Sequence, residues 1–145
     1  IVREMTDNLV LDLFEKGLVT SSLTLRIAYD HRYEHEASKG TVKLERESNS
    51  SKKIIDAVED LYLRIADRYT GIRRIEVCAN RVAPESYVQY SLFDDPKQTD
   101  KERHLQEAVL NVKQRYGKNA IMRGSNLLEC STYRERNEQI GGHRA

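Results

Sequence analysis

The sequence predicts an α+β fold of the two-layer sandwich type, in which an antiparallel sheet carries two helices on one face. Two observations lead to this prediction. Apolar residues recur at helical spacing in two segments, and they recur at every second position in three others. In chain order these segments read helix, strand, strand, helix, strand, which is a split βαβ unit that lacks its first strand.

The first helix is expected over residues 1–16. Apolar residues recur at steps of three or four from Val2 to Leu13, and Gly17 is suited to end a helix in the left-handed conformation. One face of this helix should therefore be buried.

A β-hairpin is expected next. Apolar and mostly polar residues alternate from Leu23 to Tyr29, and the same period of two returns at Val42 and Leu44, after a loop around residues 39–40. Each strand should bury one face and expose the other.

The second helix and the last strand complete the predicted core. Residues 49–51 offer an N-cap, and a wide apolar stripe runs from Ile54 to Gly71. Residues 74–80 alternate again as in a strand, which Pro84 closes.

The rest of the chain reads as a linker and a tail. Residues 84–100 are mostly polar and include Pro96, a third helix is expected from Leu105 to Tyr116, and no sustained period follows Gly117. We therefore expect a domain over residues 1–83, a linker over 84–100, and a C-terminal helix with a loosely structured basic tail over 101–145.

The composition bounds the function. A chain of 145 residues with 39% hydrophobic residues suits one domain and an appendage, and 24 Lys+Arg nearly cancel 23 Asp+Glu. Any binding to nucleic acid must then come from local placement of charge. Cys78 and Cys130 lack CxxC spacing, which favours a reducing cytosol over a disulfide scaffold or a zinc site.

The sequence contains neither a long apolar stretch nor a charged-then-apolar leader, so we expect a cytoplasmic protein. The chain opens with Ile1 inside a helical pattern, which suggests that it is a fragment of a longer protein.

The sheet face that points away from the helices is the first candidate site. Hydroxyls, amides and a few cations suit contacts to phosphates, which position a protein on a duplex without reading its sequence. The side chains expected there are Thr24, Arg26, Lys43, Arg74 and Asn80, with Ser48, Asn49 and Ser50 near one end. The alternative is a plain solvated face, and Glu45, Glu76 and Asp30 count against DNA.

A second candidate is a short peptide in the polar linker. It consists of Gln89, Tyr90, Ser91, Leu92 and Phe93. Two large apolar side chains stand there where nothing local buries them, so the peptide either docks on a partner or folds back onto its own domain.

A metal site is a weaker alternative. His31 and His35 alternate with charged residues and would share a face at strand spacing, but they lie at a hairpin tip without a third ligand fixed by spacing. The sequence shows no phosphate loop, no hydrolase or metalloprotease motif and no secure acid-base pair. We therefore expect no cofactor, no metal and no catalytic residue.

Several segments resemble the C-terminal part of Y-family translesion DNA polymerases. The order of elements and residues 72–77 resemble the little-finger domain and its last strand, and residues 89–93 are similar to a sliding-clamp-binding motif, with Tyr90 the one departure. Residues 117–124 and 134–145 resemble the C-terminus of ImpB/MucB/SamB-type, UV-repair polymerases of Gram-positive bacteria and their phages.

The resemblance implies sequence-independent binding of the template-primer backbone and docking on the sliding clamp, within DNA repair and the SOS response. The expected DNA contacts are Thr24, Arg26, Lys43, Ser48, Asn49, Ser50, Arg73 and Arg74, and the expected clamp contacts are Gln89 to Phe93. It also implies that the catalytic palm of a parent DNA-directed DNA polymerase is absent from this chain.

Two further expectations accompany this resemblance. The first strand of the little finger would precede Ile1 and would leave a slot between the last strand and the hairpin, through which copies of the chain could associate. The competing function is an RNA-binding module of ferredoxin-like fold, which would need aromatic side chains on the open sheet face.

Overall fold

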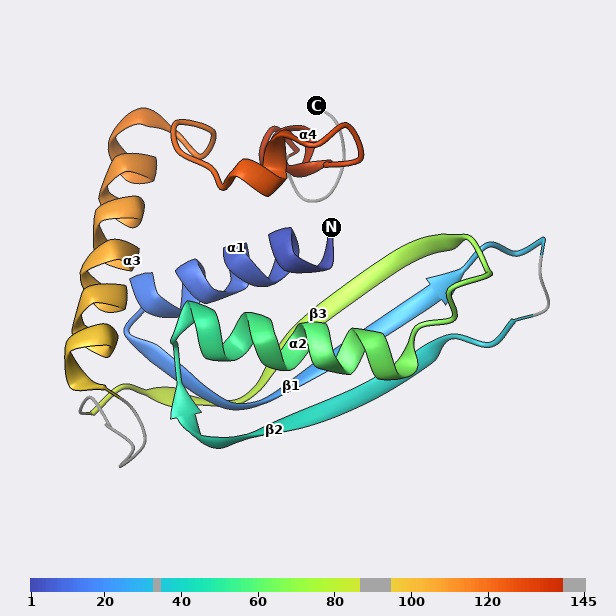
Figure 1. The fold of residues 1–145 in the computed structure, drawn as a ribbon, viewed down its shortest axis with the longest axis horizontal. Coiled ribbons are helices and arrows are strands. Elements are labelled where there is room, and N and C mark those ends of the chain that lie inside the picture. The colour runs from blue at the N-terminus through green and yellow to red at the C-terminus, as the bar shows by residue number, and fades with distance from the viewer. Residues whose placement is uncertain (33–34, 87–94, 140–145) are drawn as a thin grey trace. The chain divides into compact units, whose positions relative to one another are not determined.

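The computed structural model describes residues 1–32, 35–86 and 95–139. The chain divides into two compact units, one formed by Val2–Gln89 and the other by Tyr90–Ala145 with Ile1. The first unit contains helix α1 (Val2–Glu15), strands β1 (Leu18–Tyr29) and β2 (Ser38–Ser48), helix α2 (Ser51–Ile65) and strand β3 (Ile72–Pro84) (Figure 1). This order confirms the predicted α+β core.

Strand β1 is the centre of a three-stranded antiparallel sheet with the order β2-β1-β3. The ladder between β1 and β3 begins at the pair Leu18–Pro84 and reaches the pair Tyr29–Ile72. The slot that was expected between the last strand and the hairpin is therefore a wrong prediction. The backbone groups of β3 bond directly to those of β1, which removes the reason given for self-association through that slot.

The core lies between one face of this sheet and the two helices, as Figure 1 shows. Three alternate residues of β1 are fully buried, and full burial of such a side chain is worth about 1.5–3 kcal/mol. The buried core residues of this sandwich are Val10 and Leu13 from α1, Leu23, Leu25, Ile27 and Tyr29 from β1, and Ile54, Val58 and Leu61 from α2. The prediction that the alternate residues from Leu23 to Tyr29 are buried is confirmed.

Helix ends follow the local sequence in most places. Gly17, two residues after the end of α1 at Glu15, has a φ of 62°, and the Ser50 side chain caps α2 by accepting a hydrogen bond from Lys53 N at 3.3 Å. Helix α2 ends at Ile65, however, and does not reach Gly71. The backbone N–H of Tyr69 donates to the Asp67 carboxylate at 3.0 Å, and such local bonds compete with helical ones.

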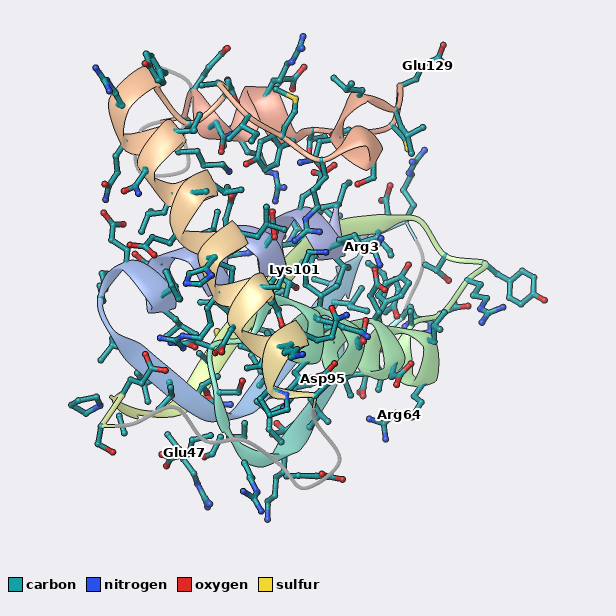
Figure 2. All side chains as sticks on the ribbon, turned by 60° about the vertical axis from the view of Figure 1, so that its left-hand side comes forward. Arg3, Glu47, Arg64, Asp95, Lys101 and Glu129 are labelled. Carbon is teal, nitrogen blue, oxygen red and sulfur yellow. The ribbon has the colours of Figure 1, made fainter. Side chains whose placement is uncertain are left out.

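An ion pair also joins the two helices. Arg3, labelled in Figure 2, places its Nε 2.7 Å from Oε1 of Glu59 on α2. Both side chains are more than one third exposed, and exposed pairs contribute at most about 1 kcal/mol. Apolar burial is therefore the main contribution that holds α1 on α2.

The second unit contains helix α3 (Pro96–Tyr116), a 3₁₀ turn η1 (Gly124–Leu127) and helix α4 (Tyr133–Asn137). Helix α3 begins inside the segment that was predicted as a linker, because Asp95 caps it and Pro96 occupies its first turn. Beyond Gly117 the described residues form only η1 and α4, which are joined by turns and irregular chain, as expected for an irregular tail.

The ring of Tyr133 organises this tail. Its side chain is only 1% exposed, the Lys113 ammonium lies over its ring at 5.1 Å and also donates to its hydroxyl, and Asn137 Nδ2 donates to Asn119 Oδ1 at 2.7 Å. These contacts join residues distant in sequence, which local periodicity does not reveal.

Gly40 is predicted to be intolerant of a side chain. A Cβ at this position would lie 2.8 Å from Leu61 Cδ1 and 3.1 Å from Ile65 Cγ2, both on α2. Overpacking of this kind costs about 1–3 kcal/mol, which exceeds the gain of about 0.4–1 kcal/mol from a less flexible unfolded chain. Chemical denaturation of Gly40→Ala should show a net loss of roughly 1 kcal/mol in the free energy of unfolding.

Gly71→Ala is the matched control. A Cβ there would meet its nearest neighbour, Asp30 Cβ, at 3.9 Å, which is ordinary contact. Equal stabilities of the two variants would contradict this account of how α2 approaches β2.

Candidate nucleic-acid interface

The pairing register brings a set of polar side chains together on the face opposite the helices. Leu23, Leu25 and Ile27 face the helices, so the residues between them on β1 face away, together with their partners on β2 and β3. The paired rows are Ser22 with Lys43 and Asn80, Thr24 with Thr41 and Cys78, Arg26 with Lys39 and Glu76, and Ala28 with Arg74. We call these eleven positions the open face.

A hydrogen-bonded row of neutral groups crosses all three strands of the open face. Asn80 Nδ2 donates to Thr24 Oγ1 at 2.8 Å, and the hydroxyl oxygens of Thr24 and Thr41 lie 2.8 Å apart. The three side chains hold one another in place. The row therefore presents oriented hydroxyl and amide groups of the kind that contact phosphates.

The charges of the open face are mostly positive. Arg26, Lys39, Lys43 and Arg74 give four positive charges against the one negative charge of Glu76, a balance of three. Each of the two arginine side chains is more than half exposed. The surface therefore offers cationic donors to solvent, although the composition of the chain is nearly neutral.

Glu76 lies between the two arginines. Its Oε1 is 2.8 Å from Arg74 Nε and its Oε2 is 3.7 Å from Arg26 Nη1. One carboxylate thus orients two guanidinium groups from neighbouring strands, and it lowers the positive potential between them.

Three of the predicted DNA contacts lie elsewhere. Ser48 Oγ accepts from Ser50 N at 3.0 Å, Ser50 caps α2, and Asn49 is buried with its Nδ2 donating to Leu18 O at 3.1 Å. These side chains build the connection from β2 to α2. Their polar character was visible in the sequence, but their bonding to the backbone was not.

Arg73 also departs from the expected arrangement. The register shifts between the pairs Ala28–Arg74 and Tyr29–Ile72, so Arg73 is the extra residue of a β-bulge in β3. It lies near Asp30, whose pKa is lowered chiefly by the hydrogen bonds from Arg32, with smaller effects of the charges on His31 and Arg73. Arg73 is therefore at one end of the sheet and outside the paired rows of the open face.

Glu45 and Asp30, expected to oppose DNA binding, do not belong to these rows. The last regular pair of the β1–β2 ladder before its shift is Ser22–Lys43, and Glu45 lies beyond it. Asp30 follows the end of β1 and holds Arg32, whose Nη2 is 2.7 Å from its Oδ2. Only Glu76 reduces the charge of the open face.

Lys39 and Thr41 are open-face residues that the sequence analysis did not choose. Residues 39–40 were assigned to a loop, whereas β2 begins at Ser38. The alternation of buried and exposed residues extends through positions 39 and 41, but Gly40 stands where the buried face of the strand would carry an apolar side chain. Without an apolar residue at position 40, the sequence pattern did not reveal the start of the strand.

The two histidines proposed as metal ligands do not share a strand. Strand β1 ends at Tyr29, and the His35 ring lies 4.4 Å from the Tyr29 ring, with its Nε2 3.4 Å from Asp67 Oδ2. Over residues 1–32, 35–86 and 95–139 no group of three His, Cys, Asp or Glu side chains is placed to hold a metal ion.

Cys78 and Cys130 are both exposed free thiols. Within the part of the chain that the structure describes, no helix is long and apolar enough to cross a membrane. The candidate clamp-binding residues Gln89 to Phe93 lie outside the described residues.

The sequence of this chain matches a known family. Residues 1–92, which include every element from α1 to β3, match the family model of the impB/mucB/samB family C-terminal domain. "DNA polymerase IV 2" of Bacillus subtilis (strain 168) is 31% identical over 102 residues, which cover 70% of this chain and 24% of that protein. The chain therefore spans about a quarter of the length of that relative.

The carboxylate of Asp67 should make the stability of the first unit depend on acid pH. The Thr70 hydroxyl and then the Tyr69 N–H donate to it, and these bonds lower its pKa below the ordinary 3.8. Because this pKa is lower in the folded state than in the unfolded chain, the Asp67 carboxylate stabilises the fold. Its stabilisation is complete above about pH 4 and is lost as the pH falls through the folded-state pKa. Thermal unfolding of Asp67→Asn should show a weaker dependence on pH below about 4 than the parent.

Asp12→Asn is the control, since Asp12 pairs only with Lys16 in the exposed last turn of α1. A parent and an Asp67→Asn variant with identical acid dependence would disprove the assigned role of Asp67.

Proposed function

This chain belongs to the impB/mucB/samB family of C-terminal domains of Y-family DNA polymerases, and from this membership we propose that its open face binds the backbone of template-primer DNA. The observation that carries the proposal is the arrangement of four cations around a hydrogen-bonded row of hydroxyl and amide groups.

The proposed contacts are directed at phosphates. Lys39 and Lys43 lie on β2 and Arg26 lies on the neighbouring strand β1, and neighbouring strands are about 4.8 Å apart in a sheet. The three cationic groups are therefore spread over the surface. Phosphate contacts fix the position of a protein on a duplex and carry no sequence information. Binding should therefore be indifferent to sequence and sensitive to salt.

The RNA-binding alternative lacks the groups it requires. None of the eleven open-face positions carries an aromatic side chain, and Tyr29 is buried on the side of the helices. Modules that read single-stranded RNA on a sheet stack bases on aromatic side chains of the exposed face. The open face therefore favours contacts to a backbone over stacking of bases.

We place this domain in a larger protein of the same class. The parent is proposed to be a cytoplasmic DNA-directed DNA polymerase that acts in translesion synthesis, with its catalytic carboxylates outside this chain. The role that we assign to the present residues is to hold the duplex, since contacts to phosphates position DNA without reading its sequence.

The second proposed partner is the sliding clamp, bound by Gln89 to Phe93. The support for it is the sequence of this peptide, in which Leu92 and Phe93 would enter an apolar pocket and Gln89 would supply a polar anchor. Burial of the two apolar side chains is worth about 1.5–3 kcal/mol each, and ordering costs about 0.5–1.5 kcal/mol per side chain. The peptide alone should bind in the micromolar range.

The first test removes or restores charge on the open face. With about three phosphates neutralised, the logarithm of the binding constant should fall with the logarithm of salt concentration at a slope near −3. Arg26→Ala and Arg74→Ala should weaken binding equally on unrelated duplex sequences and reduce the slope by about 1. Glu76→Gln should tighten binding, because it removes the one negative charge of the open face.

Fluorescence anisotropy of labelled duplexes at several salt concentrations measures these effects, with Arg3→Ala on α1 as the matched arginine control. An arginine variant that altered sequence preference and left the salt slope unchanged would exclude phosphate contact as the mode of binding.

The second test separates clamp docking from folding. If Leu92 and Phe93 bind the clamp, the double variant Leu92→Ala with Phe93→Ala should lose clamp binding in calorimetry and keep the melting temperature and duplex affinity of the parent. If the two side chains instead pack on their own domain, the melting temperature should fall. A double variant that still binds the purified clamp like the parent would refute the assignment.

A further inference from the structure

Tyr69 is the most exposed large apolar side chain in the described part of the chain. Its relative accessibility is 97%, so the ring makes almost no contact within the protein. It lies in the connection between α2 and β3, residues 66–71, which we call the end loop. Tyrosine usually buries its ring and exposes only its hydroxyl, so a fully exposed ring suggests a role in binding.

The end loop presents this ring from a fixed backbone. Asp67 N donates to the Tyr29 hydroxyl at 2.8 Å, Asp30 N donates to Gly71 O at 2.8 Å, and Tyr69 N donates to the Asp67 carboxylate at 3.0 Å. Tyr29 is itself part of the core. The loop is thus tied to the end of β1 at both of its ends, so its backbone has little freedom to lose when the ring binds.

The surroundings of Tyr69 are cationic. Residues 30–32 and 64–74 contain five arginines and two aspartates. Both aspartates are engaged locally, Asp30 by Arg32 and Asp67 by the end loop. The remaining arginines are Arg64, which extends from the last turn of α2 (Figure 2), Arg68, which precedes Tyr69 in the end loop, Arg73 in the bulge and Arg74.

We propose that Tyr69 is a stacking platform for an unpaired nucleobase, with Arg68 and Arg73 contacting the flanking phosphates, and that its ligand is single-stranded DNA. Aromatic rings on which bases stack, combined with cations that follow the backbone, are the two features shared by proteins that bind single strands without sequence preference. An exposed tyrosine among arginines also occurs at protein interfaces, but there the ring usually enters a pocket at the centre of an apolar patch.

This site is separate from the open face. The end loop lies at the end of the sheet where β1 and β2 are also connected, as Figure 1 shows, whereas Thr24 and Asn80 lie in the middle of the strands. Arg73 and Arg74 are consecutive, and only Arg74 belongs to the open face. A strand that leaves a duplex on the open face would pass this pair of arginines before it reached Tyr69.

The test compares unpaired and paired DNA with the full chain. A short fluorescein-labelled oligodeoxythymidine should bind the parent, and Tyr69→Ala should weaken it roughly 5- to 150-fold, the loss expected for one stacked base. Tyr69→Phe keeps the ring and should bind like the parent. Tyr116→Ala removes another exposed tyrosine, on α3, and should have no effect.

A spectroscopic measurement identifies the contact. A 2-aminopurine placed in the single strand should lose fluorescence on stacking with the parent and with Tyr69→Phe, and it should keep its fluorescence with Tyr69→Ala. Arg68→Ala should weaken binding and lower the salt slope by about 1 without restoring the fluorescence.

A blunt duplex of mixed sequence separates this site from the open face. Tyr69→Ala should bind that duplex like the parent, and loss of duplex binding by Arg26→Ala would leave single-strand stacking unaffected. Equal binding of the single strand by the parent and Tyr69→Ala would overturn the proposal and leave the end loop as a surface for a protein partner. Absence of single-strand binding by the parent would overturn it as well.

Discussion

The position of β1 between two partner strands is the constraint on which the first unit depends. The backbone N–H and C=O groups of β1 pair with β2 on one side and with β3 on the other. The side chains of β1 therefore differ in environment only by the face of the sheet on which they lie. One face buries Leu23, Leu25 and Ile27 beneath the helices. The period of two then requires that Thr24 and Arg26 point the other way, and the open face follows from the burial of the core.

The close approach of α2 to β2 completes this arrangement. Gly40 leaves the space that the ends of Leu61 and Ile65 occupy, so the helix lies directly on the edge strand. The register that pairs Gly40 with Leu25 also pairs Thr41 with Thr24, and the hydrogen bonds that join Thr24 to Thr41 and Asn80 depend on it. Core packing thus determines the spacing of the polar groups on the opposite face.

The electrostatics of this domain are local. Glu76 orients Arg26 and Arg74 and also lowers the positive potential between them. At the end of the sheet, two aspartates hold the loops and leave arginines beside Tyr69. The nearly neutral composition conceals both cationic regions, because acidic residues elsewhere on the chain balance them.

The sequence by itself determined the order of the elements, the buried phase of β1, and the ends of α1 and α2 at Gly17 and Ser50. Each of these features rests on local periodicity or on a single side chain that bonds to its neighbouring backbone. The hypothesis that Gln89 to Phe93 bind a clamp also rests on residue types alone, and these residues lie outside the described part of the chain.

Only the tertiary structure decided the strand order, the rows of the open face and the position of Arg73 in a bulge. These features depend on hydrogen bonds between strands that are far apart in the sequence, and periodicity within one strand contains no information about its neighbours. The early end of α2 also involves a tertiary contact beside the local bond from Tyr69 N to Asp67, because the Tyr29 hydroxyl accepts the backbone N–H of Asp67.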